Sequence, residues 1–225
     1  MREAVEKKVL SENDRLAAAL RQRYRDEGIL CVNLVSSPGS GKTALLEKTL
    51  AAFPQDAAVA VLTGDLQTDN DARRLARYGF PVRQIVTGGT CHLDARMVDS
   101  HLNELGFRGP GLLFVENVGN LVCPSSYDLG EAAKIVLLSV TEGEDKPLKY
   151  PGIFHRSALM ILTKTDLLPY VEFRAQLVLE NARKIHPEID YIALSARTGE
   201  GLDLWLAWLA GLRQKGQREA AATIS

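Results

Sequence analysis

ILCVNLVSSPGSGKTALLEKTL, residues 29–50, is the stretch that decides the fold. Six of its first eight residues are apolar, which predicts a strand buried on both faces. A glycine-rich turn follows, and ALLEKTL then has the composition of a helix. A strand, a glycine-rich loop and a helix in this order predict a loop whose backbone N–H groups surround phosphate groups.

The alternation of apolar runs and helix-like segments continues along most of the chain. Continuous Val, Ile and Leu runs between helices are typical of an α/β fold with a doubly wound, mostly parallel sheet and helices on both faces. We expect further strands at 57–65, 82–86, 111–117, 133–140, 158–164 and 190–196, and helices at 70–79, 93–105, 171–187 and 202–215.

Composition limits the classes of function. The 225 residues carry a formal net charge of −1, so there is no basic surplus for nucleic acid or an anionic membrane. No apolar run approaches the length of a membrane span, and the start of the chain lacks the pattern of a signal peptide. Three cysteines cannot form a fully paired disulfide framework. We therefore expect a cytoplasmic protein with reduced thiols that binds neither nucleic acid nor membranes.

The loop SSPGSGKT, residues 36–43, follows the P-loop pattern, with Ser36 in place of its first glycine. Lys42 is placed to reach the β- and γ-phosphates, and the Thr43 hydroxyl to bind Mg²⁺. The residues expected to contact the phosphates are Gly39, Ser40, Gly41, Lys42, Thr43 and Ala44.

Two acids end neighbouring apolar runs, Asp65 after AVLTG and Glu116 after GLLFV. Ligand sites of open parallel sheets lie at the carboxyl ends of the strands. We therefore expect both acids to help Thr43 hold Mg²⁺ and, with Lys42, to act in catalysis by ordering an attacking water. Alternatively, either acid caps the next helix. The sequence favours this alternative more for Asp65 than for Glu116. Asp69 is expected to cap the 70–79 helix or to position water.

Two further elements predict a guanine site. TKTD, residues 163–166, resembles the NKxD element of GTP-binding proteins, with a threonine where an asparagine is usual. Asp166 is placed to accept hydrogen bonds from guanine N1 and N2, which adenine cannot supply, and the stem of Lys164 to lie over the base. In LSAR, residues 194–197, Ser195 and Ala196 match a second base-binding element, and the Ala196 N–H is placed to reach guanine O6. GTP or GDP is therefore the expected ligand.

These elements define the expected domains. Residues 28–215 form a P-loop GTPase domain, residues 1–27 an N-terminal helical extension and residues 216–225 a flexible tail. Segments 117–132 and 141–157 are the longest without a regular pattern, and loops of this length are often functional.

Cys91 and His92, in TGGTCHLD, follow the predicted strand at 82–86, and Cys123 follows the one at 111–117. Two thiolates and an imidazole suit Zn²⁺ or Ni²⁺ and leave a coordination position open. If the chain dimerises there, a two-fold axis would either bring six ligands together or share a metal between the subunits. The spacing also allows a second interpretation, in which the two cysteines are core residues and His92 caps a helix. Cys31, in the first strand, is expected to be a core residue.

Six segments together resemble the hydrogenase nickel-incorporation GTPases, the HypB family, over residues 30–212. They are SSPGSGKT, GDLQTDNDARR, GGTCHLDA, LLFVENVGNLVCP, TEGEDKPLKYP and LTKTDLL. The resemblance implies that Cys91, His92 and Cys123 bind Ni²⁺ or Zn²⁺, and that GTP binding forms a homodimer with the metal at or near its interface. It also implies delivery of nickel to the hydrogenase large subunit, together with hydrogenase maturation proteins. The related urease nickel GTPases have a different pattern around the CHLDA segment.

Other interpretations stay open at this stage. One is a nickel-binding dimeric module with incidental GTP turnover, another a GTPase chaperone for urease or a cobalamin-dependent mutase, and a remote one a small-molecule kinase. The motifs contain no evident arginine finger, so we expect slow intrinsic hydrolysis. In the 141–151 segment, Lys146 or Lys149 is expected either to cross to the partner's nucleotide or to be a solvated charge.

Overall fold

A seven-stranded parallel sheet forms the centre of the computed structural model, which describes residues 2–65 and 69–224. The strand order is β3-β2-β4-β1-β5-β6-β7, and every neighbouring pair is parallel. The predicted doubly wound α/β fold is therefore confirmed, with a sheet that is wholly parallel. The strands are β1 (Ile29–Ser36), β2 (Val59–Asp65), β3 (Val82–Val86), β4 (Gly111–Gly119), β5 (Ala133–Ser139), β6 (Leu159–Thr163) and β7 (Asp190–Ala193).

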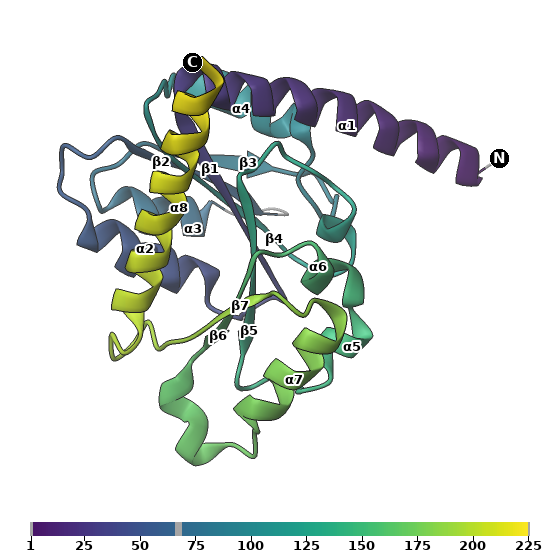
Figure 1. Ribbon diagram of the computed structural model, residues 1–225, viewed down its shortest axis with the longest axis vertical. Coiled ribbons are helices and arrows are strands. Elements are labelled where there is room, and N and C mark those ends of the chain that lie inside the picture. The colour runs from purple at the N-terminus through teal and green to yellow at the C-terminus, as the bar shows by residue number, and fades with distance from the viewer. Residues whose placement is uncertain (1, 66–68, 225) are drawn as a thin grey trace.

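Helices cover both faces of this sheet (Figure 1). On β1, Val32 and Leu34 face a cluster built with α2, α3 and α8, whereas Cys31 and Val35 face clusters built with α1, α4, α6 and α7. The prediction that Cys31 is a core residue is confirmed, because only 1% of it is exposed. The helices are α1 (Arg2–Glu27), α2 (Lys42–Ala52), α3 (Asn70–Ala76), α4 (Ala95–Leu105), α5 (Lys146–Lys149), α6 (Pro151–His155), α7 (Ala175–Ile185) and α8 (Leu202–Ile224), with short 3₁₀ helices η1 (Cys123–Ser125) and η2 (Thr165–Tyr170).

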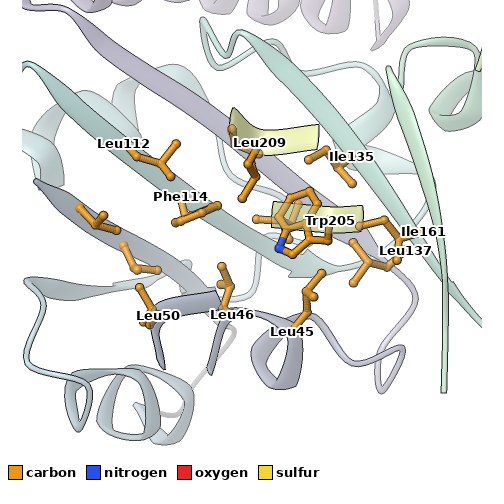
Figure 2. Packing of buried hydrophobic residues seen from close by; sticks show 14 of the residues in the cluster. Leu45, Leu46, Leu50, Leu112, Phe114, Ile135, Leu137, Ile161, Trp205 and Leu209 are labelled. Atoms are coloured by element: carbon orange, nitrogen blue, oxygen red, sulfur yellow. The ribbon is translucent and has the colours of Figure 1, made fainter. Parts of the chain in front are cut away.

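Trp205 of α8 fixes the packing of the first face. It is fully buried among the leucines of α2 and the apolar side chains of the central strands (Figure 2). Its indole Nε1 donates a hydrogen bond to Thr49 Oγ1 at 2.9 Å, so its polar atom has a partner inside the core. This packing holds α2, the helix that follows the P-loop, against the sheet.

The ends of several elements differ from the prediction. The sequence predicts a helix ending at residue 215 and a flexible tail over 216–225, but α8 continues to Ile224. Its last residues are mostly Ala, Glu, Arg and Gln, which favour helix strongly enough to pass Gly216. Segment 141–157, predicted to be irregular, contains the short helices α5 and α6. Within the described residues, no helix is both long and apolar enough to cross a membrane.

The strand order places a crevice at the carboxyl ends of β1 and β4. These strands are neighbours, yet the chain leaves β1 toward β2 on one side and leaves β4 toward β5 on the other. Ligands of open α/β sheets bind at such a reversal of direction. At this edge the backbones come close together, since a Cβ on Gly119 would lie 2.9 Å from the Cα of Pro38 in the P-loop.

Candidate functional site

The P-loop leads from β1 into α2 and turns sharply at Gly41. This residue is the N-cap of α2 and has φ 95°, a left-handed conformation that favours glycine. The Lys42 side chain is buried, and its ammonium donates a hydrogen bond to Ser36 Oγ at 2.9 Å. Burial lowers the pKa of Lys42, while the charge of Glu116 opposes that shift. Ser36, the departure from the usual pattern, thus orients the lysine.

Thr43 and Glu116 meet at the first turn of α2. Thr43 Oγ1 donates a hydrogen bond to Glu116 Oε1 at 2.7 Å. The other oxygen of Glu116 is buried and lacks a hydrogen-bond partner among the described residues. Burial raises the pKa of Glu116 to about 7, against the opposing charge of Lys42. A hydroxyl and a buried carboxylate with an unpartnered oxygen form a donor set of the type that binds Mg²⁺.

Asp65 is the last residue of β2, the strand between β3 and β4. Its backbone carbonyl accepts a hydrogen bond from the Thr87 N–H. Its charge acts on Lys42, so it lies in the electrostatic field of the P-loop. The N-cap position of α3 is occupied by Asp69 and not by Asp65. Asp69 accepts no capping hydrogen bond and instead pairs with Arg73 at 2.8 Å.

Three of the predicted base-binding residues, Lys164, Asp166 and Ala196, line a cavity of about 260 Å³ beside the P-loop. Ser195 is fully buried and donates a hydrogen bond to Asp166 Oδ1 at 2.6 Å, which orients the carboxylate. The Thr163 hydroxyl donates to the Ser40 carbonyl at 2.7 Å, so the residue in the usual asparagine position still ties this element to the P-loop. The cavity is lined by Gly41, Ala44, Thr163, Lys164, Asp166, Leu167, Leu194, Ala196 and Arg197.

Of the two lysines expected either to cross to a partner's nucleotide or to be solvated charges, Lys146 lies beside the P-loop of its own chain. Its ammonium is 3.5 Å from Ser37 Oγ and 3.4 Å from Glu142 Oε2. Lys149 is exposed and pairs with Asp145 at 2.6 Å, apart from the residues that line the base cavity.

Sequence reasoning missed two acids near the phosphate site. Glu142 accepts hydrogen bonds from Ser40 Oγ and from the Ser139 N–H, and Asp71 acts electrostatically on both Lys42 and Glu116. Both acids stand in segments that the resemblance quotes, GDLQTDNDARR and TEGEDKPLKYP. Their positions within those segments were the signal that could have identified them.

The structure brings Cys91, His92 and Cys123 together. Their ligand atoms all lie within 4.8 Å of one another, and no other group of three or more His, Cys, Asp or Glu side chains in the described residues is so arranged. The two sulfurs are 2.6 Å apart, and all three side chains are partly exposed. This arrangement argues against the interpretation of the cysteines as core residues. Three ligands of this kind leave the fourth position of a tetrahedral metal ion open.

The imidazole of His92 is held by stacking. Its ring centroid lies 3.8 Å from that of Tyr127, and the planes differ by 25°. Burial lowers the pKa of His92, although the charge of Asp94 opposes this, so the neutral form that ligates metals is favoured. The alternative role of His92 as a helix cap is wrong, because Asp94 accepts the capping hydrogen bond from the Met97 N–H at 2.8 Å. The hydrogen bond between the two thiols raises the pKa of Cys123, and burial and the charge of Cys91 act in the same direction.

Comparison with known proteins agrees with this geometry. The CobW/HypB/UreG nucleotide-binding domain matches residues 30–193. The chain therefore belongs to the CobW/HypB/UreG family of nucleotide-binding domains.

Within that family the chain is similar to hydrogenase maturation factors named HypB, which confirms the resemblance drawn from the motifs. It is 52% identical to that of Azotobacter vinelandii, over 95% of this chain and 70% of that protein. It is 46% identical to the hydrogenase/urease maturation factor HypB of Helicobacter pylori strain J99, over 87% of this chain and 82% of that protein. The crystal structure of Helicobacter pylori HypB in complex with nickel superposes with a TM-score of 0.85 at 43% identity, covering 91% of this chain and 96% of that chain.

Proposed function

We propose that the chain is a GTP-hydrolysing metallochaperone that binds nickel, or zinc, and delivers nickel during maturation of nickel–iron hydrogenase. The observation that carries this proposal is the cluster of Cys91, His92 and Cys123, whose ligand atoms lie within 4.8 Å of one another. Strand β4 links the cluster to the P-loop. It carries Glu116, which accepts a hydrogen bond from Thr43, and Cys123 follows Glu116 by seven residues in the chain. The nickel complex of the Helicobacter pylori relative supports nickel as the cargo.

In the proposed hydrolysis, water attacks the γ-phosphorus of GTP and the bond to the bridging oxygen of the β-phosphate breaks. Lys42 binds the β- and γ-phosphates, and Asp65 and Glu116 orient the water. Thr43 and Glu116 would hold Mg²⁺, which would supply positive charge to balance the charge that develops on the phosphates. Asp166 selects guanine by accepting hydrogen bonds from N1 and N2 of the base. Because the sequence motifs contain no evident arginine finger, we expect this hydrolysis to be slow.

The proposed switch joins hydrolysis to metal release. GTP binding orders the 87–94 and 117–130 segments, which carry the three metal ligands, and favours a homodimer with the metal near its interface. Loss of the γ-phosphate loosens both the segments and the dimer. Metal binding then alters nucleotide affinity by the same factor. Lys146 is better placed than Lys149 to act on phosphate, because it already lies beside Ser37 of the P-loop.

The experiment follows phosphate release from GTP, nickel binding and oligomeric state for the purified chain. We expect slow phosphate release that requires Mg²⁺, and nickel affinity and dimer content that differ between GDP and a non-hydrolysable GTP analogue. Nickel binding that is identical with either nucleotide, together with an unchanged monomer fraction, would contradict the switch. Wild-type phosphate release by Lys42→Ala would contradict the role of the P-loop in hydrolysis.

A second candidate target is urease, because the Helicobacter pylori relative is named a hydrogenase/urease maturation factor. In a strain that makes both nickel enzymes, deletion of this chain's gene should abolish hydrogenase activity. An additional loss of urease activity, restored by nickel in the medium, would support the wider role. Normal hydrogenase activity in the deletion strain would contradict the proposal.

A further inference from the structure

A buried polar network lies beneath the two loops that carry the metal cluster. Asn33 of β1, Asn117 of β4 and Lys134 of β5 occupy adjacent strands of the sheet. Their side chains are 0%, 1% and 6% exposed. They lie on the face that α1, α4 and α7 cover, where the neighbouring strand positions are apolar. Three polar side chains at such positions need a reason beyond packing, because an apolar core would stabilise the fold as well.

One end of the network holds the loop that carries Cys91 and His92. Asn117 Oδ1 accepts a hydrogen bond from the Leu93 N–H at 3.1 Å, immediately after His92 in the chain. Asn117 Nδ2 donates in turn to Asn33 Oδ1 at 3.3 Å. Both Leu93 and Asn117 are buried, so water does not compete for this contact.

The other end holds the loop that carries Cys123. The Lys134 ammonium donates hydrogen bonds to the carbonyls of Pro124 and Tyr127, each at 3.0 Å. Pro124 follows Cys123, and Tyr127 is the residue whose ring stacks on His92. A backbone carbonyl that is bonded to a buried ammonium has little freedom to move, so this loop is held within η1 and again just after it.

Glu131 joins the two ends. It accepts a hydrogen bond from Asn33 Nδ2 at 3.1 Å, and it pairs with Lys134 at 3.4 Å. Its second oxygen accepts from the Leu129 N–H at 2.6 Å. A continuous path of side-chain contacts therefore runs from Leu93 through Asn117, Asn33, Glu131 and Lys134 to Pro124 and Tyr127.

We propose that Asn117 and Lys134 are positioning residues for the metal cluster. From the two ends of this network they hold the Cys91–His92 loop and the Cys123 loop at the spacing that lets three ligand atoms meet one cation. The inference rests on metal binding at the cluster, as set out under the proposed function. It predicts that metal affinity depends on two side chains that never touch the metal, as is usual for the groups that orient metal ligands.

Two variants separate a positioning role from a general effect on folding. In Glu131→Gln/Lys134→Met both charges are removed together, so neither is left buried without a partner. In Asn117→Leu the contact with the Leu93 N–H is lost from the opposite end. The matched control is Asn181→Leu, because Asn181 is also buried and donates to a distant backbone carbonyl, that of Glu144 at 3.0 Å, but lies in α7.

The measurement titrates Co²⁺ into each protein and follows the thiolate-to-cobalt charge-transfer band, with the affinity for a fluorescent GDP as the second readout. We expect the Kd for Co²⁺ to rise by about 10- to 100-fold in both network variants, with an altered absorption band. The Kd for GDP should stay within about two-fold of the wild-type value in the network variants and in Asn181→Leu.

The outcomes distinguish this inference from the proposed function. A wild-type chain without a thiolate-to-cobalt band would contradict metal binding at the cluster and the positioning role with it. A wild-type band that both network variants retain, at unchanged affinity, would contradict the positioning role alone. An equal loss of Co²⁺ and GDP affinity, or a loss of Co²⁺ affinity in Asn181→Leu as well, would also contradict it, since the effect would then be one of general stability.

Discussion

The nucleotide site and the metal cluster lie at the same edge of the sheet, yet they are held in place by different means. In the proposed nucleotide site, Lys42 and Thr43 sit on the first turn of α2. Each is oriented by a strand residue, Lys42 by Ser36 at the end of β1 and Thr43 by Glu116 within β4. In the metal cluster, Cys91, His92 and Cys123 lie in connections between strands and helices. Regular structure positions the first site, whereas buried side chains elsewhere in the sheet position the second.

This difference indicates which site tolerates change around it. A binding side chain on a helix turn or a strand keeps its geometry as long as the fold persists, because many backbone hydrogen bonds together hold that element in place. The loop ligands depend on a few specific contacts, such as Asn117 Oδ1 to the Leu93 N–H. Substitutions remote from both sites should therefore affect metal affinity before they affect nucleotide affinity.

Removal of both thiols should give the largest effect and sharpen the contrast between the sites. In Cys91→Ser/Cys123→Ser, two of the three ligands no longer favour a soft cation, and we expect Ni²⁺ affinity to fall by about 1,000-fold or more. The Kd for GDP should stay near the wild-type value. Isothermal titration with both ligands measures this. Cys31→Ala is the control, because Cys31 is a buried thiol outside the cluster and should leave nickel binding unchanged.

Substitution of the P-loop lysine should act on the other site. Lys42→Ala removes the buried ammonium that is placed to reach two phosphates. Because charge-assisted hydrogen bonds to the phosphates are lost, we expect GTP affinity to fall by about 100-fold. Nickel affinity without nucleotide should be unchanged. Fluorescent-nucleotide titration gives the first value and nickel titration the second. Lys48→Ala, at an exposed position of the same helix, should bind GTP as the wild type does.

A matching loss of nickel affinity in Lys42→Ala without nucleotide would break the comparison. It would mean that the P-loop supports the metal loops directly, and that the two sites are not held independently.

Substitution of the proposed base acceptor should have a smaller and more selective effect. Asp166→Asn replaces an acceptor-only carboxylate, which Ser195 orients at 2.6 Å, with an amide that donates toward the guanine N–H groups. We expect the preference for GDP over ADP to fall by about 10- to 100-fold. Competition of GDP and ADP for a fluorescent nucleotide measures it. Asp203→Asn is an exposed control in α8, and a GDP preference retained in Asp166→Asn would contradict the assignment of the base site.

The same division explains what the sequence could predict. Local patterns predict the order of strands and helices, because each element depends on residues close by in the chain. For the same reason they predict that Lys42 and Thr43 begin a helix and that Asp166 follows β6. Thr163 is informative, since it departs from the usual asparagine and still donates to Ser40 O. The meeting of three ligands from two loops was anticipated from the motifs.

The network below the cluster could not be predicted from local patterns. Asn33 and Lys134 stand inside apolar runs, where one polar residue carries no periodic signal, and their partners are up to 98 residues away. The continuation of α8 past residue 215 was missed for another reason. Gly216 is a helix-stop signal, but the Ala-rich residues after it favour helix and outweigh the cost of one glycine, about 1 kcal/mol.

The smallest predicted effect tests whether α1 also supports the loop that carries Cys123. Arg21 of α1 donates hydrogen bonds to both carboxylate oxygens of Asp128, at 2.7 and 2.6 Å. Both side chains are about 40% exposed, so screening by solvent reduces the contribution of the pair to the free energy of unfolding to about 0.5 kcal/mol. Arg21→Ala should therefore lower Tm by about 1–2 °C. Arg15→Ala, which removes an exposed pair within α1, should leave Tm unchanged.

The pH dependence of that difference identifies the interaction. Burial of the Asp128 carboxyl acts to raise its pKa, but hydrogen bonds from Arg21 and from the Gly130 N–H prevail and lower it below the ordinary value. A group whose pKa is lowered by folding stabilises the protein above its unfolded pKa, and that contribution disappears as the pH falls through the folded pKa. The Tm difference between wild type and Arg21→Ala should therefore be constant from pH 5 to 7 and shrink below about pH 4. A difference that persists unchanged at low pH would assign the effect to packing of the arginine stem, and α1 would then not support the loop through this pair.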